Sequence, residues 1–285
     1  MPELPEVETI ARGLHANLAG KKIVGLTVLN KKSFSGDKRK VIDQKIVAVD
    51  RRAKVLRMKL GSGNYLLFHL KMTGQLIYIN HNMRIAGGHA DHDWHAELPN
   101  SHTRVIFDFG KEQKLYFNDM RKFGWCKLVT RAEMNEYFTK YGPEPLPQID
   151  LKSLQARAAR MSRSMIKKFL MDQSVIAGIG NIYADETLYA ARIHPKRLVG
   201  SITDVEWQKI VTEAERILKL AVEKGGTTDS DYVDAEGKKG GMQDFLQVYH
   251  HAGEPCPSRC GGKIERIVVG GRGTHFCPEC QREEK

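Results

Sequence analysis

At 285 residues, 41% of them apolar and 28% charged, the chain has the size and composition of a folded protein with about two domains. It contains no apolar run near the ~18 residues of a membrane span and no signal-peptide pattern, which argues against the membrane and secreted classes and leads us to expect a cytoplasmic protein. The net charge of +11 and the pI of about 9.4 predict a polyanionic partner, nucleic acid before membrane.

The first residues, Met1-Pro2-Glu3, predict a covalent catalyst built from the N-terminus. Cells usually remove an initiator Met that precedes a small residue, which would leave the secondary α-amine of Pro2. Because α-amines titrate near neutral pH, a fraction of this amine is unprotonated and can attack a carbonyl-like carbon to form a Schiff base. Glu3 lies next to it and can supply or accept a proton. The alternative is that Pro2 is only a remnant of translation.

The first half of the chain predicts one helix followed by antiparallel strands. In residues 6–19 the apolar side chains repeat at the helical period, and Gly20 ends the helix. From 21 to 130, runs of β-branched and aromatic residues alternate with turn residues and have no helices between them, which predicts a sandwich or barrel. The expected strands are 23–29, 46–49, 55–60, 65–79, 105–109, 115–117 and 125–129.

Residues 80–101 interrupt the strand pattern. Their Asn, Gly and Pro residues predict a long surface loop. Histidines in this segment leave a metal site open, although polar loops often collect histidines without binding metal. These histidines are His81, His89, His92 and His95.

A proline-rich segment, Tyr141–Pro147, predicts a domain boundary, because three prolines in five residues cannot continue a helix or a central strand. Beyond it the apolar period becomes helical. The longest expected helix has a capping box of Thr203 and Glu206 and ends at Gly225. Residues 225–242 are rich in glycine and polar residues, which predicts a mobile loop. The expected helices are 151–161, 165–171, 182–191 and 205–224.

The segment Gln173–Glu186 predicts a tight turn between two helices. Gly178 and Gly180 form the turn, and Asn181 begins the second helix. Free backbone N–H groups and an Asn side chain at a helix N-terminus form a phosphate site. The alternative is a plain glycine turn with Asn181 as the helix N-cap.

Four cysteines near the C-terminus have the spacing of a zinc site. Cys256 and Cys260 form a C-x3-C pair, and Cys277 and Cys280 form a C-x2-C pair after sixteen residues. Four thiolates complete a tetrahedron and leave no open position, so we expect one structural Zn²⁺ and not a catalytic metal. The alternatives are two disulfides or inert thiols.

Between the cysteine pairs the sequence predicts a β-hairpin with strands 264–269 and 274–276. The expected turn is Gly270-Gly271-Arg272-Gly273, with Arg272 at its tip and glycines that let a phosphate approach closely. The fifth cysteine, Cys126, lies in a strand pattern and is expected in the core.

Six short segments form one combined pattern along the chain. They are PELPEVE at 2–8, RRAK at 51–54, HLKMTG at 69–74, DMRKFG at 119–124, GIGNIYA at 178–184, and the cysteine segment with GGRGTHF at 270–276. Together they resemble, from end to end, the bacterial formamidopyrimidine-DNA glycosylase family. The combination is specific, although no single segment is.

The resemblance implies an α+β fold in four parts. An N-terminal catalytic domain at 1–132 is an antiparallel β-sandwich with an N-terminal helix, and a Pro-rich linker follows at 133–150. A helix-two-turn-helix DNA-binding domain spans 151–247 and includes the loop 225–242, which would close over the lesion. A β-hairpin zinc finger occupies 248–285.

The resemblance implies a bifunctional enzyme of base excision repair that acts as a monomer on duplex DNA. Family members remove oxidised purines, such as 8-oxoguanine and formamidopyrimidines, and then cut the strand at the abasic site. By analogy Pro2 attacks C1′ of the damaged nucleoside, Glu3 is the general acid that opens the sugar, and β- and δ-elimination follow without a catalytic cofactor. Lys54, expected as a strand residue, would contact phosphate or aid proton transfer, the alternative being a solvated surface lysine. Arg272 would grip phosphate and serve the δ-elimination.

The resemblance also assigns residues that bind DNA while the damaged base is flipped out. Met72, Arg121 and Phe123 would fill the space left in the base stack. By themselves, Met72 and Phe123 would more often be core residues. The other expected DNA contacts are His69, His102, Arg163 and Asn181.

The chain departs from the family pattern in several places. The first cysteine pair is C-x3-C where the family usually has C-x2-C, and the loop 80–101 is longer. A lysine-rich run is replaced by Arg160–Arg163, which leaves Arg163 or Ser162 as the phosphate contact.

Two rival functions remain open. One is an endonuclease VIII-like glycosylase for oxidised pyrimidines, which shares the fold and the N-terminal proline. The PELPE opening and the glycines around Arg272 favour the purine enzyme. The other is a non-catalytic zinc protein that binds damaged DNA, which would leave Pro2, Glu3 and Lys54 without a role.

Overall fold

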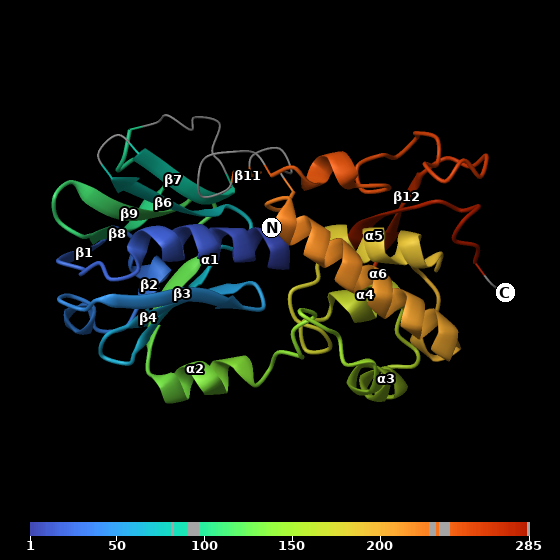
Figure 1. Cartoon of the computed structure of the whole chain (residues 1–285), viewed down its shortest axis with the longest axis horizontal. Helices are drawn as coiled ribbons and strands as arrows, with labels where there is room; N and C mark the ends of the chain where they lie inside the picture. Colours follow the sequence, from blue (N-terminus) through green and yellow to red (C-terminus); the bar gives the residue numbers. More distant parts are fainter. Residues whose placement is uncertain (81–82, 90–96, 228–231, 234–239, 284–285) are drawn as a thin grey trace. The chain divides into compact units, whose positions relative to one another are not determined.

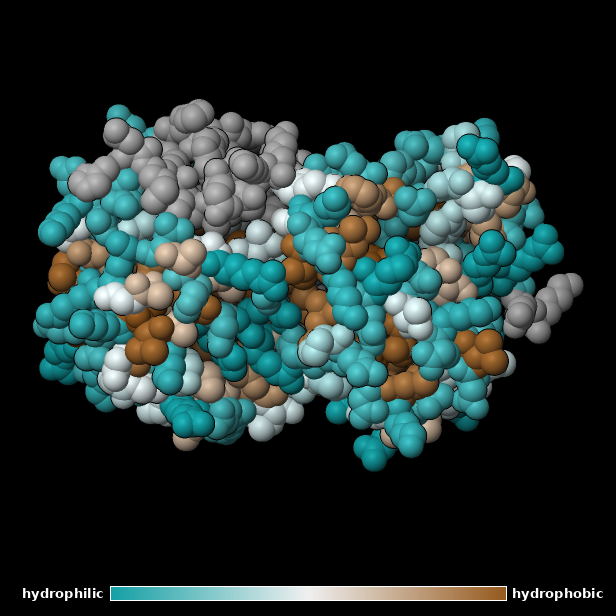
Figure 2. All heavy atoms as spheres, viewed as in Figure 1, coloured by the Kyte–Doolittle hydropathy of each residue, from teal (hydrophilic) through white to brown (hydrophobic). Residues whose placement is uncertain are grey.

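The chain folds into two units in the computed structural model, which describes residues 1–80, 83–89, 97–227, 232–233 and 240–283 (Figure 1). Unit 1 contains Met1–Thr139 and Val222–Gln243, and unit 2 contains Lys140–Ala221 and Asp244–Lys285. Across these described ranges, no helix is both long enough and apolar enough to span a membrane. Figure 2 shows hydrophilic residues over most of the face in view, broken by small apolar groups.

Helix α1, Leu4–Leu18, forms because its apolar residues repeat at the helical period and become fully buried. It packs against β3 and β4 of one sheet and against β7 of another (Figure 1). The helix begins two residues before the expected start, since Pro5 is tolerated in the first turn and the Glu6 carboxylate caps the backbone N–H of Glu3.

Two sheets share one core in unit 1. The first has the strand order β1-β8-β9-β6-β7-β11 and pairs antiparallel, and the second has the order β2-β10-β5-β4-β3, in which β10 and β2 run parallel. Apolar side chains from both sheets and from α1 form a single cluster. The predicted sandwich with its N-terminal helix is therefore confirmed. The elements are β1 (Gly25–Val28), η1 (Lys31–Ser33), β2 (Phe34–Ser35), η2 (Lys38–Lys40), β3 (Ile46–Arg52), β4 (Val55–Leu60), β5 (Tyr65–His69), β6 (Gly74–Asn80), β7 (Met83–His89), β8 (Thr103–Asp108), β9 (Gln113–Asp119), β10 (Trp125–Val129) and β11 (Tyr232–Val233).

The expected single strand 65–79 is two strands. β5 belongs to the five-stranded sheet and β6 to the six-stranded sheet, so the chain crosses between the sheets at residues 70–73. Lys71 adopts a left-handed φ of 55° there, and the backbone N–H of Gly74 donates to the carbonyl of Leu70 at 2.8 Å. Because both strands are apolar, the sequence pattern runs through the crossing without a break.

The prediction of a loop over 80–101 is wrong for its first part, where β7 pairs with β6 and with β11. Gly87 and Gly88 permit close packing inside a strand, since a Cβ on Gly87 would lie 2.4 Å from Cγ1 of Ile10 and one on Gly88 would lie 2.4 Å from the carbonyl oxygen of Gly74. Part of the expected mobile loop 225–242 is also a strand, β11. The predictions on His81, His92 and His95 and on most of 225–242 lie outside the described residues.

Helix α2, Arg131–Phe138, lies where the sequence predicts the start of the Pro-rich linker. Thr130 and Glu133 form its capping box, and Met134 packs on β4 and β5 against Val55 and Leu67. The helix thereby covers the second face of β5, which explains why that strand is apolar on both faces.

Unit 2 is built from helices and one hairpin. The capping box predicted for the longest helix is present: the N–H of Thr203 donates to Glu206 Oε2 at 2.8 Å, and the N–H of Glu206 donates to Thr203 Oγ1 at 3.3 Å.

The buried carboxylate of Glu186 accepts the backbone N–H groups of residues 247–249. Burial raises the pKa of this carboxyl group, although the three hydrogen bonds act to lower it. The elements are α3 (Leu151–Arg160), α4 (Ile166–Met171), α5 (Asn181–Ala191), η3 (Val199–Ser201), α6 (Asp204–Glu223, which runs into unit 1), η4 (Met242–Phe245, at the boundary), β12 (Glu265–Val269) and β13 (Arg272–Phe276).

The contact between α1 and β7 predicts that Gly87→Ala destabilises the protein. The new methyl group would overlap the buried Ile10 side chain, so we expect a loss of about 1–3 kcal/mol in the free energy of unfolding, measured by urea denaturation. Gly61→Ala is the matched control, because its Cβ would meet nothing closer than 3.7 Å. It should change stability by less than ~0.5 kcal/mol. Equal stability of the two variants would contradict the packing of α1 on β7.

Candidate active site and nucleic-acid interface

The N-terminal residues are held at the start of α1. Pro2 is half-buried and Glu3, 3% exposed, is the N-cap with extended backbone. The N–H of Glu3 donates to Glu6 Oε2 at 2.8 Å, so the residue next to Pro2 is fixed to the first turn of a packed helix. Met1 is 48% exposed, which leaves it accessible for removal.

Glu6 also holds the beginning of the segment 225–242. Its Oε1 accepts the backbone N–H of Thr227 at 2.8 Å and the Thr227 hydroxyl at 3.2 Å. Gly226 has φ +81°, and a Cβ there would lie 2.8 Å from Glu6 Oε1. One buried carboxylate thus joins Glu3 to this segment. The sequence analysis missed Glu6, because an acidic residue in a first helical turn is common without any further role.

Lys54 lies in a turn and not in a strand. Arg52 pairs with Val55, so Ala53 and Lys54 form a two-residue turn between β3 and β4, with Ala53 at a φ of 54°. Lys54 is only 5% exposed. The alternative of a solvated surface lysine is therefore wrong.

The three residues expected to enter the base stack lie on two turns of unit 1 and are exposed. Met72 is 40% exposed and Phe123 is 55% exposed, so the alternative that they are core residues is wrong. The Arg121 guanidinium lies 4.9 Å from the centre of the Phe123 ring, a cation–π contact that keeps the two side chains together.

The two histidines expected to contact DNA differ in exposure. His69 ends β5 and is 8% exposed, and its Nδ1 accepts the backbone N–H of Lys71 at 3.1 Å. His102 is half-buried, and its carbonyl accepts the N–H of Asp119 at 2.9 Å. His69 therefore supports the turn that carries Met72.

In unit 2, Asn181 is the first residue of α5, and Gly180 is the N-cap. The N-cap alternative for Asn181 is therefore wrong, and its side-chain Nδ2 instead donates to the carbonyl of Gly273 at 2.9 Å. Gln173 closes the turn, with Nε2 donating to the carbonyl of Ile179 at 2.7 Å. Arg163 is exposed in the turn between α3 and α4.

Arg272 is not at the tip of the hairpin. Val269 pairs with Arg272, so the turn is Gly270-Gly271, and both glycines have positive φ angles of 57° and 76°. Arg272 is the first residue of β13, and its exposed side chain lines a pocket of about 230 Å³ together with Lys168. The prediction was wrong because it counted Gly273 as a turn residue, whereas Gly273 pairs with Val268 inside the hairpin.

A buried ion pair connects the hairpin to the helices of unit 2. Lys167 Nζ lies 2.6 Å from Asp185 Oδ1, and both side chains are fully buried. Lys167 also donates to Thr274 Oγ1 at 2.7 Å and to the carbonyl of Gly273, and Asp185 Oδ2 accepts the N–H of His275 at 2.9 Å. The carbonyl of Gly273 therefore receives both Lys167 and Asn181. The sequence analysis missed this pair, because a lone charge in a short helix normally faces water.

The four cysteines of unit 2 are placed to bind one zinc ion. Their Sγ atoms all lie within 4.8 Å of one another, and zinc–sulfur bonds of about 2.3 Å require separations of about 3.8 Å. None of the four forms a disulfide. In the longer C-x3-C pair, Ser258 Oγ lies 3.2 Å from Cys256 Sγ and 3.0 Å from Cys280 Sγ, so the additional residue packs against the cluster. The residues present fit the expected structural zinc.

The prediction that Cys126 lies in the core is confirmed. It is completely buried in the cluster shared by the two sheets. Burial raises the pKa of the Cys126 thiol well above its usual value, because the thiolate is poorly solvated there.

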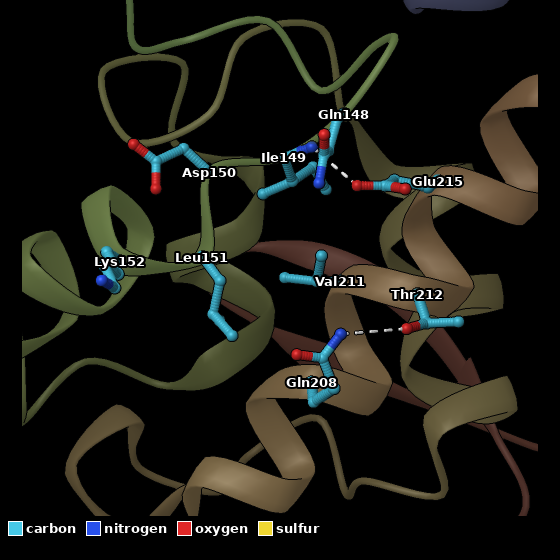
Figure 3. Close-up of a pocket in the computed structure, with 9 residues that line it drawn as sticks. All are labelled: Gln148, Ile149, Asp150, Leu151, Lys152, Gln208, Val211, Thr212 and Glu215. Carbon is cyan, nitrogen blue, oxygen red and sulfur yellow. Dashed lines mark hydrogen bonds between the residues drawn. The ribbon is translucent and has the colours of Figure 1, made fainter.

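A larger pocket of about 540 Å³ in unit 2 lies between the segment 148–152 and α6 (Figure 3). Glu215 reaches across to accept the backbone N–H of Ile149 at 2.7 Å, and Gln208 donates to Thr212 on the same helix. The residues that line it include none of those expected to bind DNA or to catalyse. Among the described residues that line this pocket, the only carboxylate on the α6 side, that of Glu215, already accepts a hydrogen bond from the segment after the prolines.

Three family models match the chain in succession. Residues 1–126 match the formamidopyrimidine-DNA glycosylase N-terminal domain, residues 141–232 match the formamidopyrimidine-DNA glycosylase H2TH domain, and residues 253–282 match the zinc finger found in FPG and IleRS. A β-sandwich with an N-terminal helix, a helix-two-turn-helix unit and a four-cysteine hairpin define this class of DNA-repair protein. The chain belongs to the formamidopyrimidine-DNA glycosylase family.

Relatives of similar length support this assignment. The formamidopyrimidine-DNA glycosylase of Pelotomaculum thermopropionicum is 41% identical over 289 residues, covering 99% of each chain, and that of Streptococcus pneumoniae is 41% identical over 291 residues, covering 100% of each. A solved complex of Lactococcus lactis Fpg with abasic-site DNA is similar with a TM-score of 0.86 and 34% identity, covering 99% of this chain and 100% of that one.

Removal of zinc should expose four thiols and leave the fifth protected. With an excess of a strong chelator, we expect four of the five cysteines to react with a thiol reagent at pH 8, whereas Cys126 should react only after denaturation. Thiol titration and mass spectrometry of the labelled peptides measure this directly. Labelling of Cys126 in the folded protein, or slow reaction of the other four after chelation, would contradict the assignment.

Proposed function

We propose that this protein is a bifunctional DNA glycosylase and abasic-site lyase of base excision repair that removes oxidised purines, 8-oxoguanine and formamidopyrimidines, from duplex DNA. The family match over the whole chain and the basic composition support this proposal. The observation that carries it is the fixed N-terminus, where Pro2 directly precedes a buried Glu3 at the start of a packed helix. Related Lactococcus structures contain DNA with an abasic site or Fapy-dG, which are the substrates expected here.

The chemistry follows from a secondary amine at the N-terminus. After loss of Met1, the Pro2 nitrogen forms a bond to C1′ while the glycosidic bond breaks and the base leaves. Glu3 protonates the ring oxygen of the sugar, which opens and leaves an iminium between Pro2 and C1′. The iminium acidifies the C2′ hydrogen, and its loss expels the 3′ phosphate. A second proton loss, at C4′, expels the 5′ phosphate, and water then hydrolyses the iminium to release the enzyme.

Lys54 and Arg272 assist these reaction steps by binding phosphate or transferring protons. Lys54 is buried in a fixed turn, which limits its side chain to a small range of positions. Arg272 stands on a hairpin whose neighbouring carbonyl, at Gly273, is held by two donors. A positive charge near the leaving phosphate stabilises the charge that develops there.

Base removal from a duplex requires that the nucleotide leaves the base stack. Met72, Arg121 and Phe123, the wedge residues, fill the space that remains, with their exposed side chains as the insertion surface. His69, His102, Arg163 and Asn181 are the further proposed contacts. The segment 225–242 closes over the flipped base.

The proposed domain division is a catalytic domain at 1–132, a linker at 133–150, a DNA-binding domain at 151–247 and a zinc finger at 248–285. The enzyme acts as a monomer. It works in the bacterial cytoplasm in association with the nucleoid, since the proposed substrate is chromosomal DNA and the relatives are bacterial.

A direct test compares a duplex that carries 8-oxoguanine opposite cytosine with one that carries thymine glycol. The purine lesion should be cut faster by at least about ten-fold, a difference of ~1.4 kcal/mol in transition-state stabilisation. Faster cutting of thymine glycol would favour the endonuclease VIII-like alternative. Binding without any cutting would favour a non-catalytic damage-binding protein.

Pro2→Gly should abolish strand cleavage while duplex binding is retained, because the variant lacks the secondary amine but keeps the rest of the chain. Borohydride reduction with an abasic-site duplex should trap the unchanged protein, with the adduct mapped to residue 2 by mass spectrometry. A second variant, which retains Met1 and therefore has no free Pro2 amine, should also fail to form the adduct. An adduct that maps to another residue would refute the assigned nucleophile.

Arg272→Ala should weaken binding of abasic-site duplex and slow strand cleavage. Loss of one phosphate contact lowers the slope of log affinity against log salt by about 1. Arg282→Ala is the control, because Arg282 is an exposed arginine of the same finger that pairs with Glu279. Equal salt slopes for the two variants and the unchanged protein would argue against a phosphate contact at Arg272.

A further inference from the structure

Both turns that carry the wedge residues are places where the chain crosses between the two sheets of unit 1. Residues 70–73 connect β5 to β6, and residues 120–124 connect β9 to β10. β6 pairs with β9 through Gly74 and Asp119, and β5 pairs with β10 through His69 and Trp125. Since each turn is flanked by the same two strand pairs, the two crossings lie side by side.

Two buried side chains link these crossings. The Thr73 hydroxyl on the first turn donates to Asp119 Oδ1 at the start of the second, and it accepts the backbone N–H of Arg121 at 3.0 Å. Asp119 Oδ2 accepts the N–H of Gly124 at 2.6 Å, which closes the second turn. One hydroxyl and one carboxylate therefore connect Met72's turn with the backbone of Arg121 and with the residue after Phe123.

The backbone of Asp119 is anchored from a third element. The carbonyl of Asp119 accepts Arg104 Nε at 2.8 Å, and its N–H donates to the carbonyl of His102. Asp119 is fully buried and Thr73 is 8% exposed, whereas Met72 and Phe123 are exposed. The linked pair therefore lies beneath the surface that the wedge residues form.

The two glycines at the ends of the turns are closely packed and leave no room for a side chain. A Cβ on Gly74 would lie 2.3 Å from the carbonyl oxygen of Leu70, and a Cβ on Gly124 would lie 3.1 Å from Asp119 Oδ2. The first turn is thus closed tightly on its own backbone, and the second turn packs on the Asp119 carboxylate.

We propose that Thr73 and Asp119 are positioning residues that hold the two turns as one rigid unit, so that Met72, Arg121 and Phe123 enter the base stack together. The inference rests on the proposed function, since it assigns a role within base extrusion. Two independent turns would each lose conformational freedom when they enter DNA, whereas a preformed pair has already lost it on folding.

Thr73→Val tests the proposal, because valine keeps the shape of threonine and removes the hydroxyl. The variant leaves the N–H of Arg121 and Asp119 Oδ1 without this partner. We expect the single-turnover rate on 8-oxoguanine opposite cytosine to fall about ten-fold or more. The fluorescence rise of 2-aminopurine placed beside the lesion, which reports unstacking, should slow by the same factor. Thr73→Ser restores the hydroxyl and should recover both rates to within about two-fold.

A single-stranded oligonucleotide with an abasic site separates positioning from damage to the fold, because no base stack has to be entered. Borohydride trapping on this substrate should stay near the level of the unchanged protein in Thr73→Val, and thermal unfolding checks its stability. If Thr73→Val does not fold, Thr73→Ala is measured in the same way. Equal losses on the single strand and the duplex, or no recovery in Thr73→Ser, would overturn the proposal. So would a normal duplex rate in Thr73→Val. If the unchanged protein forms no adduct on the single strand and none on the duplex, the proposed function itself is refuted.

Discussion

The structure of unit 1 depends on the burial of the apolar face of α1. Leu4, Val7, Ile10, Leu14 and Leu18 are at most 1% exposed, and each such side chain stabilises the fold by about 1.5–3 kcal/mol relative to exposure. They pack against strands of both sheets, so the helix cannot shift along one sheet without losing contact with the other. Because Pro2 and Glu3 directly precede this helix, the same packing fixes the proposed nucleophile and general acid.

Buried polar groups then set the irregular parts of both units. Glu6 holds Glu3 and Thr227, and Asp119 holds the turns of the wedge residues. In unit 2 the Lys167–Asp185 pair and the Glu186 carboxylate hold the hairpin and the chain that leads into it. A buried charge that lost its partners would be strongly destabilising. These groups therefore help to fix single conformations for the turns, the hairpin and the connecting segments that they contact.

The regular elements and the site motifs could largely be predicted from the sequence, and the errors have physical causes. Helices and strands follow from local apolar period, and the zinc site follows from the spacing of four thiols. Gly87 and Gly88 were misleading because glycine serves both turns and close packing. Lys54 was expected in a strand and lies in a turn, whereas Arg272 was expected in a turn and lies in a strand. Both predictions were wrong because the length of a turn depends on how the flanking strands pair. The exposure of Met72 and Phe123 depends on how the chain crosses between sheets, which no local pattern records.

The sequence by itself determined the sandwich with its leading helix, the helical second half, the four-cysteine zinc site and the family, because these depend on residue type and on spacing over short distances. Only the tertiary structure decided that Glu6 joins Glu3 to Thr227, that Thr73 and Asp119 join the two wedge turns, and that Lys167 and Asn181 meet at Gly273. Each of these contacts joins residues that are far apart in the chain or lie on different elements. Such contacts arise from the packing of whole elements, and that packing is a property of the complete fold.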